Sequence, residues 1–195
     1  MNVPAVKEVP VAKSIGRVGL VLGMMDDAYE GSAWHSLKRT LRGLTRAEMH
    51  YRPVAETLDV EERGNPPHVS TIARKVVHVA LCKVMYENHA FGGRTLNWGG
   101  AWDTLGLTEA VKGPRKLVAA LDRAHKRLRR TLASLADADL DKKVFTNWGA
   151  KVPAWWIFNT MIQHDLWHGA QISTLRTMYT LERARSRRRS GGASK

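Results

Sequence analysis

Apolar positions follow helical spacing along four long segments of the chain, and the alternation typical of strands is almost absent. The first segment covers about 18–44, and the letters GSAW at 31–34 interrupt it. The second segment begins near Ser70, a residue type that caps helices, and it ends at Gly92. These two patterns predict one interrupted helix and one continuous helix in the first half of the chain.

The second half of the chain predicts two more helices. One follows Pro114, since proline suits the first turn of a helix, and the other extends from about Pro153 to Tyr179. The third helix carries an apolar stripe made of Val118, Leu121, Leu128, Leu132 and Leu135. Amphipathic helices without a sheet to pack on must bury their stripes on one another. The pattern therefore predicts an all-α protein, a four-helix bundle with long loops between its helices.

The segments between the predicted helices read as loops. Residues 54–67 and the Gly- and Trp-rich residues 93–106 interrupt the helical pattern, and 144–154 reads as a loop with a short extended piece. The resulting organisation is an N-terminal extension at 1–17, a helix-bundle domain at 18–180 and a tail at 181–195.

Composition narrows the class of protein. A length of 195 residues with 44% hydrophobic residues suits one domain with a substantial core. The single cysteine, Cys82, excludes an internal disulfide, which favours a reducing, cytoplasmic setting. No apolar run reaches the roughly 18–20 residues of a membrane span, so we expect no membrane partner.

The net charge of +13 is concentrated in part at the C-terminus. From Glu182 to Lys195 there are six basic residues and one acidic residue, without apolar periodicity. Such a composition predicts a disordered, solvated tail. Contact with nucleic acid is the functional alternative, and we expect it to be weak and confined to the tail, because no zinc-finger or aromatic RNA-binding pattern accompanies the charge.

The fourth predicted helix carries a pair of histidines on its apolar face. His164 and His168 lie in line with Ile157, Met161, Leu175 and Met178. Two inward imidazoles one turn apart are costly to bury unless each finds a partner. Neutral imidazoles at this spacing can converge on one divalent ion, so the pair predicts two ligands of a metal site.

The letters HDLWH at 164–168 resemble the H-E-x-x-H motif of zinc proteases only in part. Asp165 stands where the general base would be, but aspartate is one methylene shorter than glutamate. No histidine follows His168, and the only later acidic residue is Glu182. We therefore interpret Asp165 as a supporting residue beside the ligands or as a salt-bridge partner.

A third metal ligand must come from upstream. His78 and His125 both lie on inward helical faces, and spacing alone leaves both open. The basic surroundings of His125, DRAHKRLRR, favour His78 modestly, because they would repel a cation. Cys82 lies one turn after His78 and is interpreted as a small core residue, with a sulfur ligand as the alternative.

Three stretches together resemble the DinB-like superfamily of metal-binding four-helix bundles. They are GSAWHSLKRTLRGLTRAE, IARKVVHVALCKVMYENHAFG and HDLWHGAQI, and the resemblance covers about 18–180. It implies the metal ligands His78, His164 and His168. It also implies that Trp34 and His35 line the mouth of a pocket. Gln171, three residues after His168, would orient a ligand or hydrogen-bond a substrate, with a hydrogen bond between two helices as the alternative.

The resemblance also implies a function. Members of this superfamily carry a divalent metal, often zinc or nickel, and several are similar to S-transferases that use a low-molecular-weight thiol. It implies that the chain is a metal-dependent thiol S-transferase acting on a small electrophilic substrate, with no confident catalytic side chain beyond the supporting candidates Asp165 and Gln171. Two alternatives stay open. One is a metal-dependent hydrolase that activates water, and the other is a non-enzymatic bundle that binds partners, as a homodimer or through its basic tail.

Overall fold

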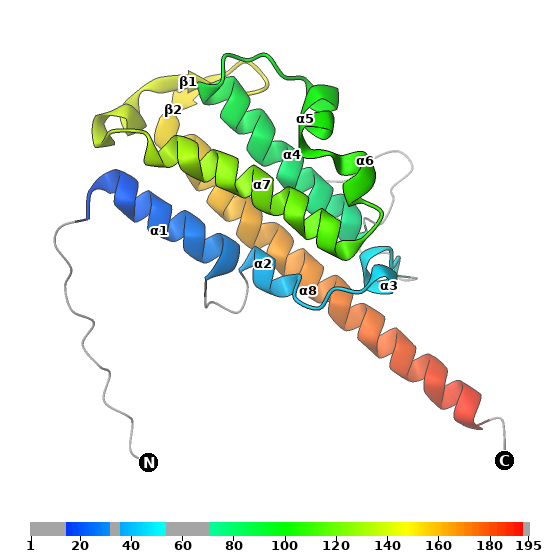
Figure 1. Ribbon diagram of the computed structural model, residues 1–195. Helices are drawn as coiled ribbons and strands as arrows, with labels where there is room; N and C mark the ends of the chain where they lie inside the picture. The colour runs from blue at the N-terminus through cyan, green and yellow to red at the C-terminus, as the bar shows by residue number, and fades with distance from the viewer. Residues whose placement is uncertain (1–14, 32–35, 54–70, 193–195) are drawn as a thin grey trace, which may run out of the picture.

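The computed structural model describes residues 15–31, 36–53 and 71–192. Figure 1 shows a predominantly helical molecule in which four long helices lie side by side. These are α1 (Arg17–Glu30), α4 (Ile72–Phe91), α7 (Pro114–Ala133) and α8 (Ala154–Gly192). Shorter elements connect them: α2 (Leu37–Thr40), α3 (Arg46–Met49), α5 (Trp98–Leu105), α6 (Leu107–Ala110), a 3-10 helix (Asp137–Asp141), β1 (Lys143–Phe145) and β2 (Lys151–Pro153).

The four long helices close into a bundle, since α4 contacts α7 and α8, and α1 contacts the same two helices. The stripe of α7 forms its centre, with Leu117, Leu121, Leu128 and Leu132 fully buried. Packing of this kind removes the apolar stripes from water, which is the main favourable term in folding. The predicted all-α class is confirmed.

Local chemistry sets the limits of the helices. Pro114 occupies the first turn of α7, as predicted. The cap of α4 is Thr71, whose hydroxyl accepts a hydrogen bond from the Arg74 backbone N–H at 3.2 Å. The predicted cap Ser70 lies outside the described residues, as do Trp34, His35 and the loop predicted at 54–67.

The connection between α4 and α7 corrects the sequence prediction. Residues 93–106 were expected to form a loop, but Trp98–Leu105 is the helix α5. Asn97 caps it by accepting a hydrogen bond from the Gly100 backbone N–H at 2.8 Å. Burial of Ala101 and Leu105, one turn apart, compensates for the two glycines that weaken the helix. At 144–154 the prediction was closer, because β1 and β2 form a short antiparallel hairpin there.

The C-terminal tail also differs from the prediction. Disorder was expected from 181 onward, but α8 continues to Gly192 and projects beyond the bundle (Figure 1). Arginine, alanine and glutamate are good helix formers, and extending an existing helix avoids the cost of nucleation. Within the described residues no helix has both the length and the apolar character needed to cross a membrane.

Candidate metal centre

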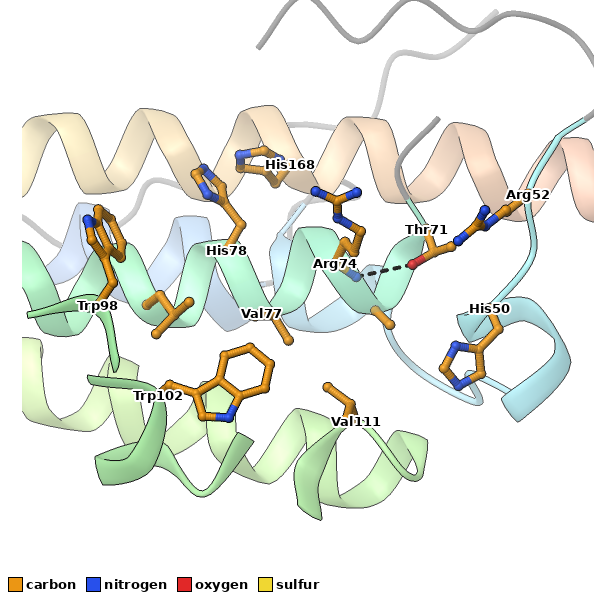
Figure 2. Close-up of a pocket in the computed structure, with 12 residues that line it drawn as sticks. His50, Arg52, Thr71, Arg74, Val77, His78, Trp98, Trp102, Val111 and His168 are labelled. Carbon is orange, nitrogen blue, oxygen red and sulfur yellow. Dashed lines mark hydrogen bonds between the residues drawn. The ribbon is translucent and has the colours of Figure 1, made fainter. Parts of the chain in front are cut away.

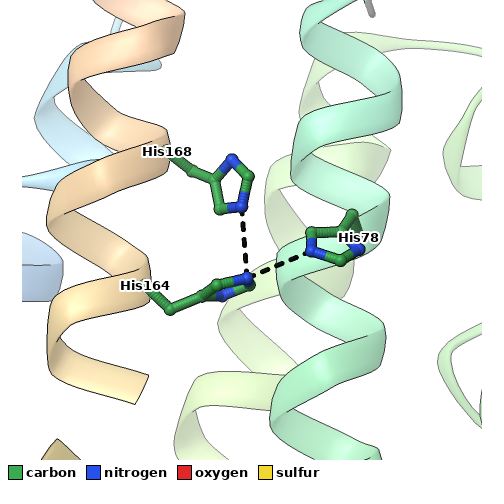
Figure 3. Close-up of side chains that lie close together, drawn as sticks. All are labelled: His78, His164 and His168. Atoms are coloured by element: carbon green, nitrogen blue, oxygen red, sulfur yellow. Dashed lines mark hydrogen bonds between the residues drawn. The ribbon is translucent and has the colours of Figure 1, made fainter. Parts of the chain in front are cut away.

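Three histidines gather where α4 and α8 face each other. His164 and His168 lie one turn apart on α8, and His78 projects toward them from α4 (Figure 3). The Nε2 atom of His164 lies 3.1 Å from the Nε2 atoms of both His78 and His168. In the part of the chain that the structure describes, these are the residues whose donor atoms cluster as metal ligands do, all within 4.8 Å of one another.

The buried rings of this cluster are neutral at physiological pH. Burial, aided by repulsion from the neighbouring rings, lowers the pKa of His164 to about 2. Burial likewise lowers the pKa of His168 to about 4. Neutral imidazole is the form that binds a metal ion. These two rings therefore need no deprotonation before they could accept a cation.

Gln171 fixes the orientation of one ring. Its Oε1 atom lies 2.7 Å from Nδ1 of His168 and accepts a second hydrogen bond from Nζ of Lys75 at 3.1 Å. Because an amide oxygen only accepts, the His168 proton must be on Nδ1, and the Nε2 lone pair is left facing the cluster. Burial lowers the pKa of Lys75 to about 8. Gln171 thus contacts one ring of the cluster and also joins α8 to α4 through Lys75.

A cavity of about 740 Å³ opens beside the cluster, and His78 and His168 form part of its wall. Figure 2 shows Arg74, Arg52 and His50 along one end, with Trp98 and Trp102 of α5 across from α4. Sequence analysis had assigned none of these five residues to a site. Arg74 carried one usable signal, because it precedes His78 by four residues and so shares its helix face.

The comparison with protein families supplies the identification. Residues 31–172 match the family model described as the DinB superfamily, which is well over half of the chain. The chain belongs to the DinB superfamily. No curated protein matches it. The family predicted from the three sequence stretches is confirmed.

In this DinB protein Asp165 forms an ion pair away from the histidines. Its Oδ2 atom accepts a hydrogen bond from Nζ of Lys83 at 2.6 Å, and both side chains are fully buried. The other oxygen, Oδ1, has no hydrogen-bond partner. Burial raises the pKa of Asp165, and the Lys83 charge opposes that rise. The geometry matches a salt-bridge partner rather than a base acting at the cluster.

The alternative ligand His125 lies elsewhere in the DinB bundle. Its ring stacks on Tyr29 with centroids 3.7 Å apart, and its Nε2 atom lies 3.7 Å from Oδ1 of Asp26. It is not part of the histidine cluster. Cys82 is buried as a core residue would be, with Sγ 3.7 Å from Nε2 of His78. His125 therefore packs in the core, and His78 is the histidine that lies beside His164 and His168.

Replacing His125 by asparagine is expected to flatten the acid dependence of stability. Burial lowers the pKa of His125 from 6.5 to about 3. Between these two pH values the histidine is protonated in the unfolded chain and neutral in the folded chain. Stability therefore falls as the pH drops through that window, by about 1.4 kcal/mol per pH unit for each such histidine. Urea unfolding at several pH values measures how the free energy of unfolding depends on pH. In His125→Asn the slope of this dependence should correspond to about one proton fewer taken up on unfolding. An unchanged slope would contradict the assignment of His125 as a buried neutral ring.

Proposed function

We propose that this DinB protein is a metal-dependent thiol S-transferase, with His78, His164 and His168 holding one divalent ion, zinc or nickel. The observation that carries the proposal is the approach of three imidazole nitrogens, at 3.1 Å, beside a cavity. Three protein ligands with an open position are typical of catalytic rather than structural metal sites. A bound divalent ion would lower the pKa of a thiol or water and so supply a nucleophile at neutral pH.

The donor set fits such an ion. The Nε2 atom of His164 faces two other imidazole nitrogens at 3.1 Å, and its Nδ1 atom is buried without a hydrogen-bond partner. Lone pairs that converge in this way are costly without a cation. Zinc and nickel both accept imidazole nitrogen.

The chain's own side chains would hold the reactants. Gln171 and Lys75 keep His168 in one tautomer, and His78 and His168 form the cavity wall where the thiol would enter. Apolar side chains of α4 and α5, among them Val77, Leu81 and Trp102, offer a surface for an electrophile. In the transfer the thiolate sulfur forms a bond to carbon, the bond from carbon to the leaving group breaks, and that group departs with the electron pair. The thiol proton passes to solvent.

A thiol panel tests the proposed reaction. The protein loaded with zinc is mixed with chlorodinitrobenzene and each of several thiols, and the thioether product is followed by absorbance and mass. We expect a rate that requires thiol and falls in His78→Ala. Ester hydrolysis that proceeds without thiol and also falls in His78→Ala would instead identify the hydrolase alternative. If the metal-loaded protein showed neither thiol transfer nor ester hydrolysis, that result would contradict an enzymatic role.

The projecting end of α8 supports a second, non-enzymatic proposal. Arg183, Arg185, Arg187, Arg188 and Arg189 are exposed on it, and such a row of cations suits phosphate contacts. A duplex DNA binding assay compares the full chain with a chain ending at 181. Salt-dependent binding that the truncation abolishes and His78→Ala preserves would favour this role. Equal, weak binding by both chains would exclude it.

Replacing Gln171 by leucine is expected to weaken metal affinity about 10- to 100-fold, the usual cost of losing a partner that orients a metal-binding histidine. The Oε1 atom that receives the His168 proton is removed, while the three rings stay. Competition with a fluorescent zinc chelator measures the change. Gln171→Glu keeps an acceptor oxygen at this position and should retain most of the affinity. Equal affinity in Gln171→Leu and wild type would show that Gln171 does not orient the ligand.

A further inference from the structure

The cavity beside the histidine cluster has a basic end. Arg52, Arg74 and His50 line it, and none of the described lining residues carries a carboxylate. Among the described lining residues no anionic group balances these guanidinium charges. A basic end of this kind favours an anionic occupant, because the two arginines attract it.

The two arginines differ from the arginines that pack on the bundle. Arg129, Arg127 and Arg176 each meet a carboxylate, at 2.7, 2.6 and 3.0 Å. Arg52 and Arg74 are exposed, and among the described residues neither guanidinium has an ion pair. Their donors are thus available to a ligand, and a guanidinium offers two parallel N–H groups that match a carboxylate.

Much of the remaining cavity lining is apolar. It is formed by Val77 and Leu81 of α4, Trp98 and Trp102 of α5, and Val111. The Trp102 indole is held in place because its Nε1–H donates to Oγ1 of Thr108 at 2.9 Å. An apolar wall makes a doubly charged phosphate costlier to desolvate than a singly charged carboxylate. The wall therefore favours a carboxylate attached to an apolar body.

We propose that the cavity binds a small carboxylate, with its charged group on Arg74 and Arg52 and its apolar body against Trp98 and Trp102. This inference rests on the proposed function for its reacting end, which would lie at His78 and His168. Arg74 and His78 are four residues apart on α4, about 6 Å along the helix axis. A molecule of a few carbon atoms can therefore reach both the arginines and the histidine cluster (Figure 2).

The carboxylate belongs either to the electrophile or to the thiol, and two probe pairs distinguish these sources. The first pair is hydrocinnamate and its uncharged amide, which represent an apolar electrophile. The second pair is mercaptopropanoate and mercaptopropanamide, which represent the thiol. Isothermal titration of the full chain measures the dissociation constant of each probe, for zinc-loaded and for chelator-treated protein.

We expect at least one acid to bind about 10-fold or more tightly than its amide, the scale of a charge-assisted bidentate contact. Arg74→Gln should remove that preference, and Arg52→Gln should reduce it. Arg130→Gln is the matched control, because Arg130 is an exposed arginine of α7 away from the cavity. A preference in the first pair assigns the carboxylate to the electrophile, and one in the second pair assigns it to the thiol.

Three results would overturn the proposal. They are equal binding of acid and amide in both pairs, no binding of either acid, and a preference that Arg74→Gln leaves as strong as Arg130→Gln does. A carboxylate that bound only the ion would give the third result and would lose its affinity in chelator-treated protein. An arginine-dependent preference that persists without zinc supports the carboxylate site even where the proposed metal chemistry fails, so the two failures are distinguishable. Thermal unfolding of each variant confirms its fold.

Discussion

Replacing Asp165 by alanine is expected to lower the free energy of unfolding by about 3–5 kcal/mol, the cost of leaving one member of a buried ion pair without its partner. Lys83 would keep its ammonium group in a position of zero exposure, with its 2.6 Å hydrogen bond to Asp165 removed. The ring of Tyr29, whose centroid lies 5.5 Å from Nζ, offers only a cation–π contact, which cannot replace the lost carboxylate. Urea unfolding followed by circular dichroism measures the change.

Glu109→Ala is the matched control for this result. Glu109 pairs with Lys112 on the surface, where both side chains are 60% exposed, and losing such a pair costs little stability because water screens the two charges. The double variant Lys83→Met with Asp165→Leu should regain most of the lost stability, because an apolar pair needs no partner charge. If Asp165→Ala cost no more than Glu109→Ala, the buried ion pair would not be the structural element described above.

Replacing His164 by alanine is expected to reduce the rate of thiol transfer by at least about 100-fold, since loss of even a supporting partner of a metal ligand costs 10- to 100-fold. His164 is the central ring of the cluster, with its Nε2 atom 3.1 Å from both neighbours. Steady-state rates with the thiol and electrophile found in the panel measure the effect. His125→Asn is the control, because it removes another buried histidine from outside the cluster. Equal losses in the two variants would point to a general loss of structure rather than to the cluster.

The sequence predicted the part of the site that depends on local periodicity. His164 and His168 are four residues apart on a helix, and helical geometry alone brings them to one face. Periodicity also predicted most of the α7 stripe, because Leu121, Leu128 and Leu132 are fully buried, whereas Val118 and Leu135 are only partly buried. His78 needed more, because periodicity left His125 equally open, and the resemblance to the DinB-like superfamily supplied the choice.

The parts that sequence reasoning missed depend on contacts between distant segments. The cavity combines Arg52 from the first third of the chain, Arg74 from α4 and Trp102 from α5, and no local pattern links them. The partner of Asp165 is 82 residues away in sequence. Lys83 carried one signal, as a lone charge in the apolar run VALCKVM, but a lysine in a helix more often lies at the surface.

The ends of the helices also divide into those that local sequence predicts and those that depend on distant contacts. The proline signal placed the start of α7 at Pro114, because its effect acts within one turn. Local sequence signals failed for α5. Its glycines predicted a loop, but the burial of Leu105 stabilises a helix there. Local signals failed again beyond residue 181, where low hydrophobicity suggested disorder but α8 simply continues. In both cases the surroundings of the segment, rather than its own composition, determined its structure.

Metal analysis of the purified chain tests the central claim most directly. Wild type, His78→Ala, His164→Ala and His125→Asn are incubated with zinc, dialysed, and measured by mass spectrometry of the bound metal. We expect about one equivalent in wild type and in His125→Asn, and loss of the metal in the two cluster variants, as for an ion held by three imidazoles. Equal metal content in all four proteins would contradict the proposal that His78, His164 and His168 form a metal site.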